Sequence, residues 1–204
     1  MGRRSDHTRE ELRELLIATG QAHMAEGGYA RFSGREVAKR AGYSVGTIYN
    51  VFGSLDQLVA AINSRTFTLW AEHLRRQLEN GGMDRIGSLV EGYFSFAVEN
   101  PQAWTAIYDH RLPEGVRLSD TDEAERGALT QIVVAEVERV VPDTTGVDAP
   151  RLARSLIATV HGHCSFLLNG SFALMGETDA AGLALARVRE SLAPHGYVPP
   201  AHQN

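Results

Sequence analysis

The chain has 204 residues, of which 43% are hydrophobic and 22% charged, enough for one or two cores; this excludes a disordered, fibrous or collagen-like protein. Its single cysteine, Cys164, cannot form an intrachain disulfide. We find neither a secretion signal nor an apolar run of the roughly 20 residues that a membrane span needs. We therefore expect a soluble, cytoplasmic protein without membrane contact.

The charge is unevenly distributed along the chain. The formal net charge is −5, but residues 1–50 hold eight basic residues against six acidic ones, or +2, which leaves −7 for the rest. The net negative charge therefore excludes a protein that binds polyanions over its whole surface. Any contact with nucleic acid is expected on a local face of the N-terminal part.

Apolar residues recur at three- and four-residue spacing along almost the whole chain, and no stretch alternates as a strand does. The sequence predicts an all-α protein of about nine helices. In the first helix, Thr8 and Glu11 form a capping box, and the helix ends near residues 27–28. Ser33 and Glu36 repeat the capping box for a short second helix, which Gly42 ends.

Ser44 is expected to cap a third, very short helix, and Ser54 with Gln57 a fourth, of about 24 residues or about 36 Å. A break at 100–101 separates the next two helices, because proline cannot continue a helix. The remaining expected segments are a loop at 113–120, a helix ending near 141, a helix at 152–168, a last helix at 178–192 and a loose tail.

Three short helices within about 45 residues form a helix-turn-helix arrangement, a common DNA-reading geometry. On the third of them, Ile48 and Phe52 are expected to point inward. The residues expected to point outward are Val45, Gly46, Thr47, Tyr49 and Asn50. An amide such as Asn50 can hydrogen-bond an adenine edge, and Val45 can pack on a thymine methyl. The hydroxyls of Ser33, Thr47 and Tyr49 can donate to phosphates.

The run from Ser33 to Ser54 resembles the DNA-binding segment of TetR-family transcriptional regulators. The shared features are an alanine, a glycine turn, Thr47-Ile48-Tyr49, a phenylalanine and a capped fourth helix, and the resemblance covers about residues 8–60. It implies a homodimer that binds a palindromic double-stranded DNA operator and releases it when a small molecule enters the C-terminal domain. It also implies phosphate contacts at Thr47 and Tyr49, base contacts at Val45, Gly46 and Asn50, and dimerisation through the last two helices.

The expected DNA-binding residues are Ser33, Arg35, Ser44, Val45, Gly46, Thr47, Tyr49 and Asn50. Two positions depart from the family pattern. Leu55 replaces a usual phosphate-binding lysine, and Val51 replaces a usual His or Tyr. Each lost cationic contact lowers the salt slope of binding by about 0.9, so we expect weaker or more base-dependent binding. Arg3 and Arg4 either compensate at the DNA or remain solvated.

In the C-terminal half, aromatic and polar side chains recur at helical spacing. This pattern is compatible with the wall of a ligand cavity and with ordinary core packing. The candidate cavity residues are Tyr93, Phe94, Trp104, Tyr108, His161 and Phe166. Val160-His161-Gly162 resembles the His-Gly element of one TetR subclass, although the preceding tryptophan of that subclass is absent.

We expect no metal site, because His161 and His163 are two residues apart and do not share a helix face. His110 with Asp109, or His161 with Cys164, could be imagined as a base and a nucleophile, but no catalytic motif accompanies them, so we expect no catalytic residue and no cofactor.

The sequence thus predicts a helix-turn-helix domain at 1–54, a connecting helix at 55–82, an effector-binding and dimerisation domain at 83–193 and a flexible tail at 194–204. The expected function is a repressor responsive to a small organic effector. The alternatives are a constitutive DNA-binding protein without an effector and an enzyme.

Overall fold

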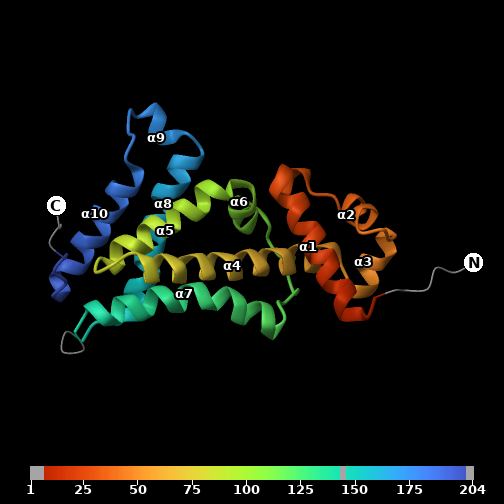
Figure 1. Cartoon of the computed structure of the whole chain (residues 1–204), viewed down its shortest axis with the longest axis horizontal. Helices are drawn as coiled ribbons and strands as arrows, with labels where there is room; N and C mark the ends of the chain where they lie inside the picture. Colours follow the sequence, from red (N-terminus) through yellow and green to blue (C-terminus); the bar gives the residue numbers. More distant parts are fainter. Residues whose placement is uncertain (1–6, 143–145, 201–204) are drawn as a thin grey trace, which may run out of the picture. The chain divides into compact units, whose positions relative to one another are not determined.

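The computed structural model describes residues 7–142 and 146–200, and the described part is helical without strands, as the sequence predicts. Its α-helices are α1 (Arg9–Gly27), α2 (Gly34–Arg40), α3 (Val45–Phe52), α4 (Leu55–Asn80), α5 (Arg85–Glu99), α6 (Pro101–Asp109), α7 (Asp120–Val140), α8 (Ala149–Leu168), α9 (Ser171–Leu174) and α10 (Ala180–Leu192) (Figure 1). The short α9 was not expected, because one turn has no periodicity to detect. No described helix is long and apolar enough to cross a membrane.

The chain divides into two compact units. The first contains residues up to 67 together with 100–126, and the second contains 68–99 and 127 onward. Of the three points at which the chain passes between units, two fall within helices, so α4 and α7 each contribute a segment to both units. The functional boundaries expected at 54, 82 and 193 stay predictions.

Local capping explains where the first helices begin. The Thr8 hydroxyl accepts from the Glu11 amide while the Glu11 carboxylate accepts from the Thr8 amide, so the predicted capping box is confirmed. The Ser33 hydroxyl accepts from the Glu36 amide, but the Glu36 carboxylate pairs with Arg40 instead of closing the box.

The turns around α3 agree in part with the sequence. Gly42 has a φ of 80°, a left-handed conformation that favours glycine, and it ends the second helix as predicted. Ser44 is the N-cap residue of α3 as predicted, but its side chain makes no capping bond to the backbone, and its hydroxyl lies 3.4 Å from the Thr47 hydroxyl. The Ser54 hydroxyl accepts from the Gln57 amide at 3.1 Å, so that cap is confirmed.

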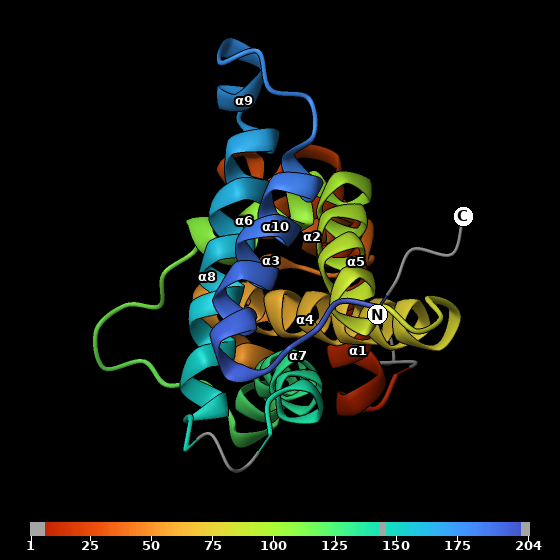
Figure 2. The same cartoon turned by 90° about the vertical axis from the view of Figure 1, so that its left-hand side faces the viewer.

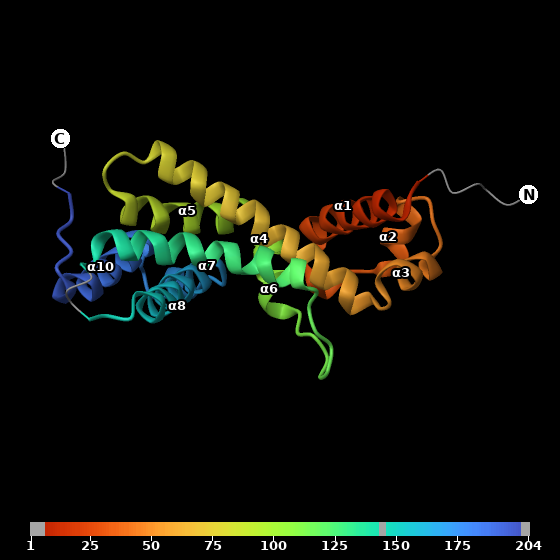
Figure 3. The same cartoon turned by 90° about the horizontal axis from the view of Figure 1, so that it is seen from below.

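In the first unit α1, α2 and α3 each contact the other two, and α6 packs on α1 (Figures 1 and 3). Their apolar faces meet in one core. The buried members of this core are Leu16, Ile17, Met24, Val37, Ala38, Ile48, Leu58, Val59, Ala61, Ile62 and Ala106. The core fixes α3 on one face and leaves its other face outside.

In the second unit α8 and α10 lie side by side, with α9 at one end of the pair, and α5 packs on both (Figure 2). Trp70 is fully buried and stacks on Phe96, with ring centroids 5.3 Å apart and planes 5° apart. The edge of Trp70 also meets the ring of Tyr93, at 4.6 Å. This aromatic cluster anchors the second segment of α4 to α5.

The tail expected to be loose is packed in the structure at one point, around the turn that follows α10. A 3₁₀ turn covers Ala193–His195, and Tyr197 is 7% exposed. Burial is the main cause that raises the pKa of Tyr197, and the neighbouring Asp84 adds to it. Arg189 donates to Asp84 at 2.6 Å in the same cluster. A buried aromatic ring holds this segment, which polar composition alone does not reveal. Residues 201–204 lie outside the described range.

Candidate DNA-binding and ligand-binding sites

The two faces of α3 differ as the sequence predicts. Ile48 is fully buried, whereas Val45 is 41% and Tyr49 53% exposed. Gly46 and Asn50 are also exposed, and Thr47 is half-buried. This helix therefore presents small, hydroxyl and amide groups to solvent on a helix-turn-helix frame, the arrangement that suits a reader of the major groove.

The turn before α3 is held by a contact that sequence reasoning missed. The Tyr43 amide donates to the Ala38 carbonyl at 2.8 Å, and the Tyr43 hydroxyl lies 2.8 Å from Nδ1 of His7. The two rings also meet edge to face, with centroids 6.2 Å apart. This contact ties His7, which lies just before α1, to the turn. Arg3 and Arg4, the expected basic arm, lie outside the described residues.

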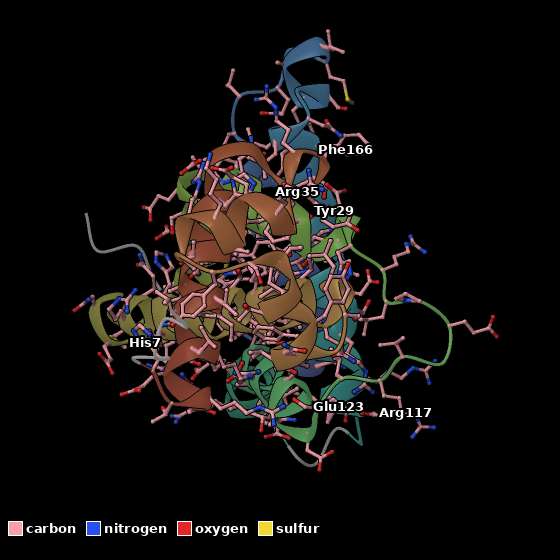
Figure 4. All side chains as sticks on the ribbon, turned by 90° about the vertical axis from the view of Figure 1, so that its right-hand side faces the viewer. His7, Tyr29, Arg35, Arg117, Glu123 and Phe166 are labelled. Carbon is pink, nitrogen blue, oxygen red and sulfur yellow. The ribbon has the colours of Figure 1, made fainter. Side chains whose placement is uncertain are left out.

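Ion pairs decide which cations near α3 remain available to an anion. Arg40 donates to Glu26 at 2.7 Å and to Glu36 at 3.0 Å. These bonds raise the pKa of Arg40 and lower the pKa of both carboxyl groups. Arg35, by contrast, lies exposed on α2 (Figure 4). Of these two arginines, Arg35 is the better candidate for a phosphate contact.

Leu55 has a packing role that the sequence did not indicate. Its side chain packs against the core of the first unit, and its Cδ1 is 2.6 Å from the position a Cβ would occupy on Gly34. The close approach of α2 and the start of α4 therefore depends on a glycine facing a branched apolar side chain.

Leu55→Lys is expected to steepen the salt dependence of DNA binding by about 0.9 in log–log slope, because the chain gains one phosphate contact. The lysine stem can follow the apolar surface while its ammonium reaches water, so the protein should still fold. Fluorescence anisotropy at several salt concentrations measures the slope. Leu55→Met is the uncharged control, and a slope equal to that of this control would place residue 55 away from the DNA backbone.

His110 is the residue directly after α6, and it connects α6 to other elements of the first unit. His110 is buried, its Nε2 lies 3.2 Å from an Asp56 carboxylate oxygen, and its ring meets Tyr29 at 5.3 Å. Asn63 donates to the Ala106 carbonyl at 3.3 Å in the same region. His110 thus links α6 to the first turn of α4 and has the contacts of a structural residue. After α6 the chain enters the loop that carries Arg117 (Figure 4), whose carbonyl accepts from the Gln57 side chain.

The second unit contains a small, partly open apolar cavity of about 40 Å³. Its walls come from α4, α5, α7, α8 and α10. The lining residues are Leu74, Ile86, Leu89, Val90, Tyr93, Val133, Val137, Leu156, Ile157, Val160 and Val188. Of these residues, Tyr93 is the one with a polar side-chain group.

Tyr93 connects the cavity to a short polar chain. Its hydroxyl lies 3.0 Å from Nδ1 of His161, and Nε2 of His161 lies 3.3 Å from the Ser165 hydroxyl. Burial lowers the pKa of His161, so the imidazole is neutral at pH 7. A neutral imidazole and two hydroxyls can exchange donor and acceptor roles within this chain of hydrogen bonds.

The structure brings together two of the six expected cavity residues, Tyr93 and His161. Phe94 is buried on α5 but does not line the described cavity. Phe166 is 46% exposed and packs on Phe172, with ring centroids 5.5 Å apart. Trp104 and Tyr108 lie on α6 in the first unit and pack on each other, at 5.1 Å. Helical periodicity predicts that such aromatics are packed, but not which partners they meet.

Among the described residues, no three His, Cys, Asp or Glu side chains are grouped so as to hold a metal ion. Cys164 is fully buried, and burial raises the pKa of its thiol to about 12. The thiol is therefore protonated at neutral pH and is neither a ready nucleophile nor a redox sensor.

A helix-turn-helix with an exposed polar reading helix, in a chain with a second helical unit around an apolar cavity, defines a DNA-binding regulator with a separate regulatory unit. A family model described as "Bacterial regulatory proteins, tetR family" matches residues 16–62. A second, described as "Tetracyclin repressor-like, C-terminal domain", matches residues 86–188. The chain belongs to the TetR family of transcriptional regulators, which are non-enzymatic DNA-binding proteins.

Solved structures share the fold. A protein of unknown function from Rhodococcus sp. RHA1 is 20% identical with a TM-score of 0.72, covering 96% of this chain and 100% of that one. A TetR-family regulator from Streptomyces coelicolor is 20% identical with a TM-score of 0.60, covering 95% and 81%. The multidrug binding protein EbrR, complexed with ethidium, is 18% identical with a TM-score of 0.62, covering 94% and 100%. No curated protein matches the sequence.

Proposed function

We propose that this regulator is a repressor that binds a palindromic operator as a homodimer and releases it when a small organic molecule enters the second unit. The observation that carries the DNA-binding part is the division of α3 into a buried Ile48 side and an exposed polar side. The apolar cavity of the second unit supports the ligand-binding part. The structure of EbrR with ethidium is a precedent for ligand binding on this fold. DNA binding favours a cytoplasmic location.

In this proposal α3 enters the major groove. Val45, Gly46 and Asn50 face bases, while Ser33, Arg35, Ser44, Thr47 and Tyr49 contact the backbone. Two copies of α3 must then lie about 34–36 Å apart, or a multiple of that distance, to read successive turns of B-DNA. The exposed side chains on α3 support these assignments, and the buried Ile48 orients them.

The dimer is proposed to form through α8 and α10. These helices pack side by side and both expose apolar side chains, since Phe166 is 46%, Leu167 36% and Leu183 39% exposed. Apolar side chains left in water on adjacent helices favour burial against a second copy. Two symmetric pairs of this kind would make a four-helix interface.

Release requires coupling between ligand binding and DNA binding. A continuous helix, α4, contributes to both units, and Leu74 on its second segment lines the cavity. A ligand that favours the DNA-incompetent state by about 1–3 kcal/mol weakens operator binding about 5- to 150-fold. Equal spacing of the two α3 helices in liganded and free dimers would contradict this mechanism.

Anisotropy titration tests the DNA-binding part of the proposal. The full chain is titrated against DNA from just upstream of its own coding region and against a scrambled duplex, at about 150 mM salt. We expect tight binding to the native fragment alone, with two chains per site. Equal weak binding to both duplexes would contradict a specific operator there, whereas specific binding that no ligand weakens would favour the constitutive DNA-binding alternative.

Tyr49→Phe is expected to weaken binding to all duplexes by a similar factor, about 2- to 12-fold, because the lost hydroxyl donates to a phosphate and reads no base. Tyr49 is 53% exposed, so the variant should retain its stability. Anisotropy on the operator and on single-base variants measures the effect. A loss confined to one operator sequence would show that the hydroxyl contacts a base.

A further inference from the structure

The loop between α6 and α7, residues 110–119, is held near both of its ends by the first turn of α4. At its start, Nε2 of His110 lies 3.2 Å from a carboxylate oxygen of Asp56. Near its end, the Gln57 side chain donates to the Arg117 carbonyl at 3.1 Å. All of these residues belong to the first unit. The loop is therefore fixed on the same compact unit as α3.

The tip of this loop is a tight turn. The Val116 amide donates to the Pro113 carbonyl at 3.1 Å, and Gly115 has a φ of 81°, which favours glycine at the third position of such a turn. Figure 3 shows the two arms of the loop running side by side. Leu112, Val116 and Leu118 are half-buried. The loop is thus a defined projection with its apolar side chains partly packed.

Two exposed arginines flank the turn. Arg111 and Arg117 are both open to solvent, and Figure 4 shows the Arg117 side chain projecting from the loop. Glu114, at the tip, is the loop's one acidic residue. Among the described residues, neither arginine side chain has an ion-pair or hydrogen-bond partner, whereas Arg65 in the same unit is bonded to Glu14 at 2.6 Å. The two guanidinium groups are therefore available to an anion.

The loop is anchored close to the reading helix. Helix α3 ends at Phe52 and α4 begins at Leu55, so two residues separate α3 from the turn that holds the loop. A helix in the major groove, about 12 Å wide, has a phosphate backbone on either side. Leu55 packs against the core, so it offers no charge to that backbone. A guanidinium held beside this turn can supply a charge-assisted hydrogen bond to a phosphate.

We propose that the α6–α7 loop is a second DNA-binding element, in which Arg117 and its neighbour Arg111 bind backbone phosphates beside the groove that α3 reads. The inference rests on the proposed placement of α3 in the major groove. It adds a contact from a segment that is more than 50 residues from the helix-turn-helix in sequence. Phosphates carry no base identity, so this contact should strengthen binding to every duplex alike.

The salt dependence of Arg117→Gln tests the contact. The full-length protein is titrated by anisotropy against its upstream duplex and a scrambled one at several salt concentrations. Loss of one phosphate contact should lower the log–log slope by about 0.9, or weaken binding about fivefold at about 150 mM salt if the contact contributes nothing at about 1 M. The matched control is Arg76→Gln, which removes an exposed arginine of the second unit and should leave the slope unchanged.

Gln57→Met tests whether the tether positions the arginine. It removes the side-chain amide that bonds to the Arg117 carbonyl, while the backbone amide of residue 57 still donates to Ser54 and caps α4. We expect weaker binding to both duplexes. The double variant with Arg117→Gln should bind no more weakly than the weaker single variant, because both changes remove the same contact. Fully additive losses would contradict a loop held in place for DNA.

The remaining outcomes separate this inference from the proposed function. Equal salt slopes for Arg117→Gln and Arg76→Gln overturn the loop contact, even where the operator is bound specifically. A loss of dimer in Arg117→Gln, measured by sedimentation velocity, overturns it in favour of a contact with the acidic first turn of α7 in a second copy. If the parent protein binds neither duplex at low salt, both the loop contact and the placement of α3 in DNA are wrong.

Discussion

Replacing Ile48 by alanine is expected to lower the free energy of unfolding of the first unit by about 2–5 kcal/mol and to remove specific DNA binding. Ile48 is fully buried and is the buried residue of α3, an eight-residue helix that is too short to be stable by itself. Without this anchor, the exposed residues of α3 lose their fixed orientation. Chemical denaturation followed by circular dichroism, together with anisotropy at a temperature where the variant is folded, measures both effects.

Val45→Ala is the matched control on the same helix. Val45 is 41% exposed, so its truncation should change the free energy of unfolding by no more than about 0.5 kcal/mol. It should still weaken operator binding if Val45 contacts a thymine methyl. Similar losses of stability in Ile48→Ala and Val45→Ala would contradict the division of α3 into a core face and a reading face.

Asn50→Ala is expected to relax the preference for one base pair by about 1–3 kcal/mol in each half-site, because an alanine cannot make the two hydrogen bonds of an amide to adenine. Asn50 is exposed on α3, so the folded protein should be as stable as the parent. A duplex library with every single-base change in one half-site, read by competition anisotropy, identifies the affected position.

The base preferences of Asn50→Ala are compared with those of Tyr49→Phe, which removes a hydroxyl from the adjacent position. Direct readout predicts that Asn50→Ala changes the order of preferred bases, while Tyr49→Phe preserves that order and lowers all affinities together. A uniform loss in Asn50→Ala would assign the amide to the DNA backbone.

Local signals in the sequence were enough for the N-terminal helices. The Thr8–Glu11 capping box, the Gly42 turn and the Ser54 cap depend on neighbours a few residues apart, so spacing alone predicts them. The periodic apolar residues of α3 likewise indicate that Ile48 is buried and Tyr49 exposed. The position and the two faces of α3 were therefore predictable, and so was the family.

The sequence by itself determined the helical class, most helix ends and the two faces of α3, because these follow from backbone capping and side-chain periodicity within a few turns. The tertiary structure decided which distant side chains meet. His7 joins Tyr43, Leu55 packs near Gly34, and Tyr93 reaches His161 across α5 and α8. Such contacts join residues from separate parts of the chain, and no local pattern specifies a partner when several aromatic and apolar side chains have similar burial requirements.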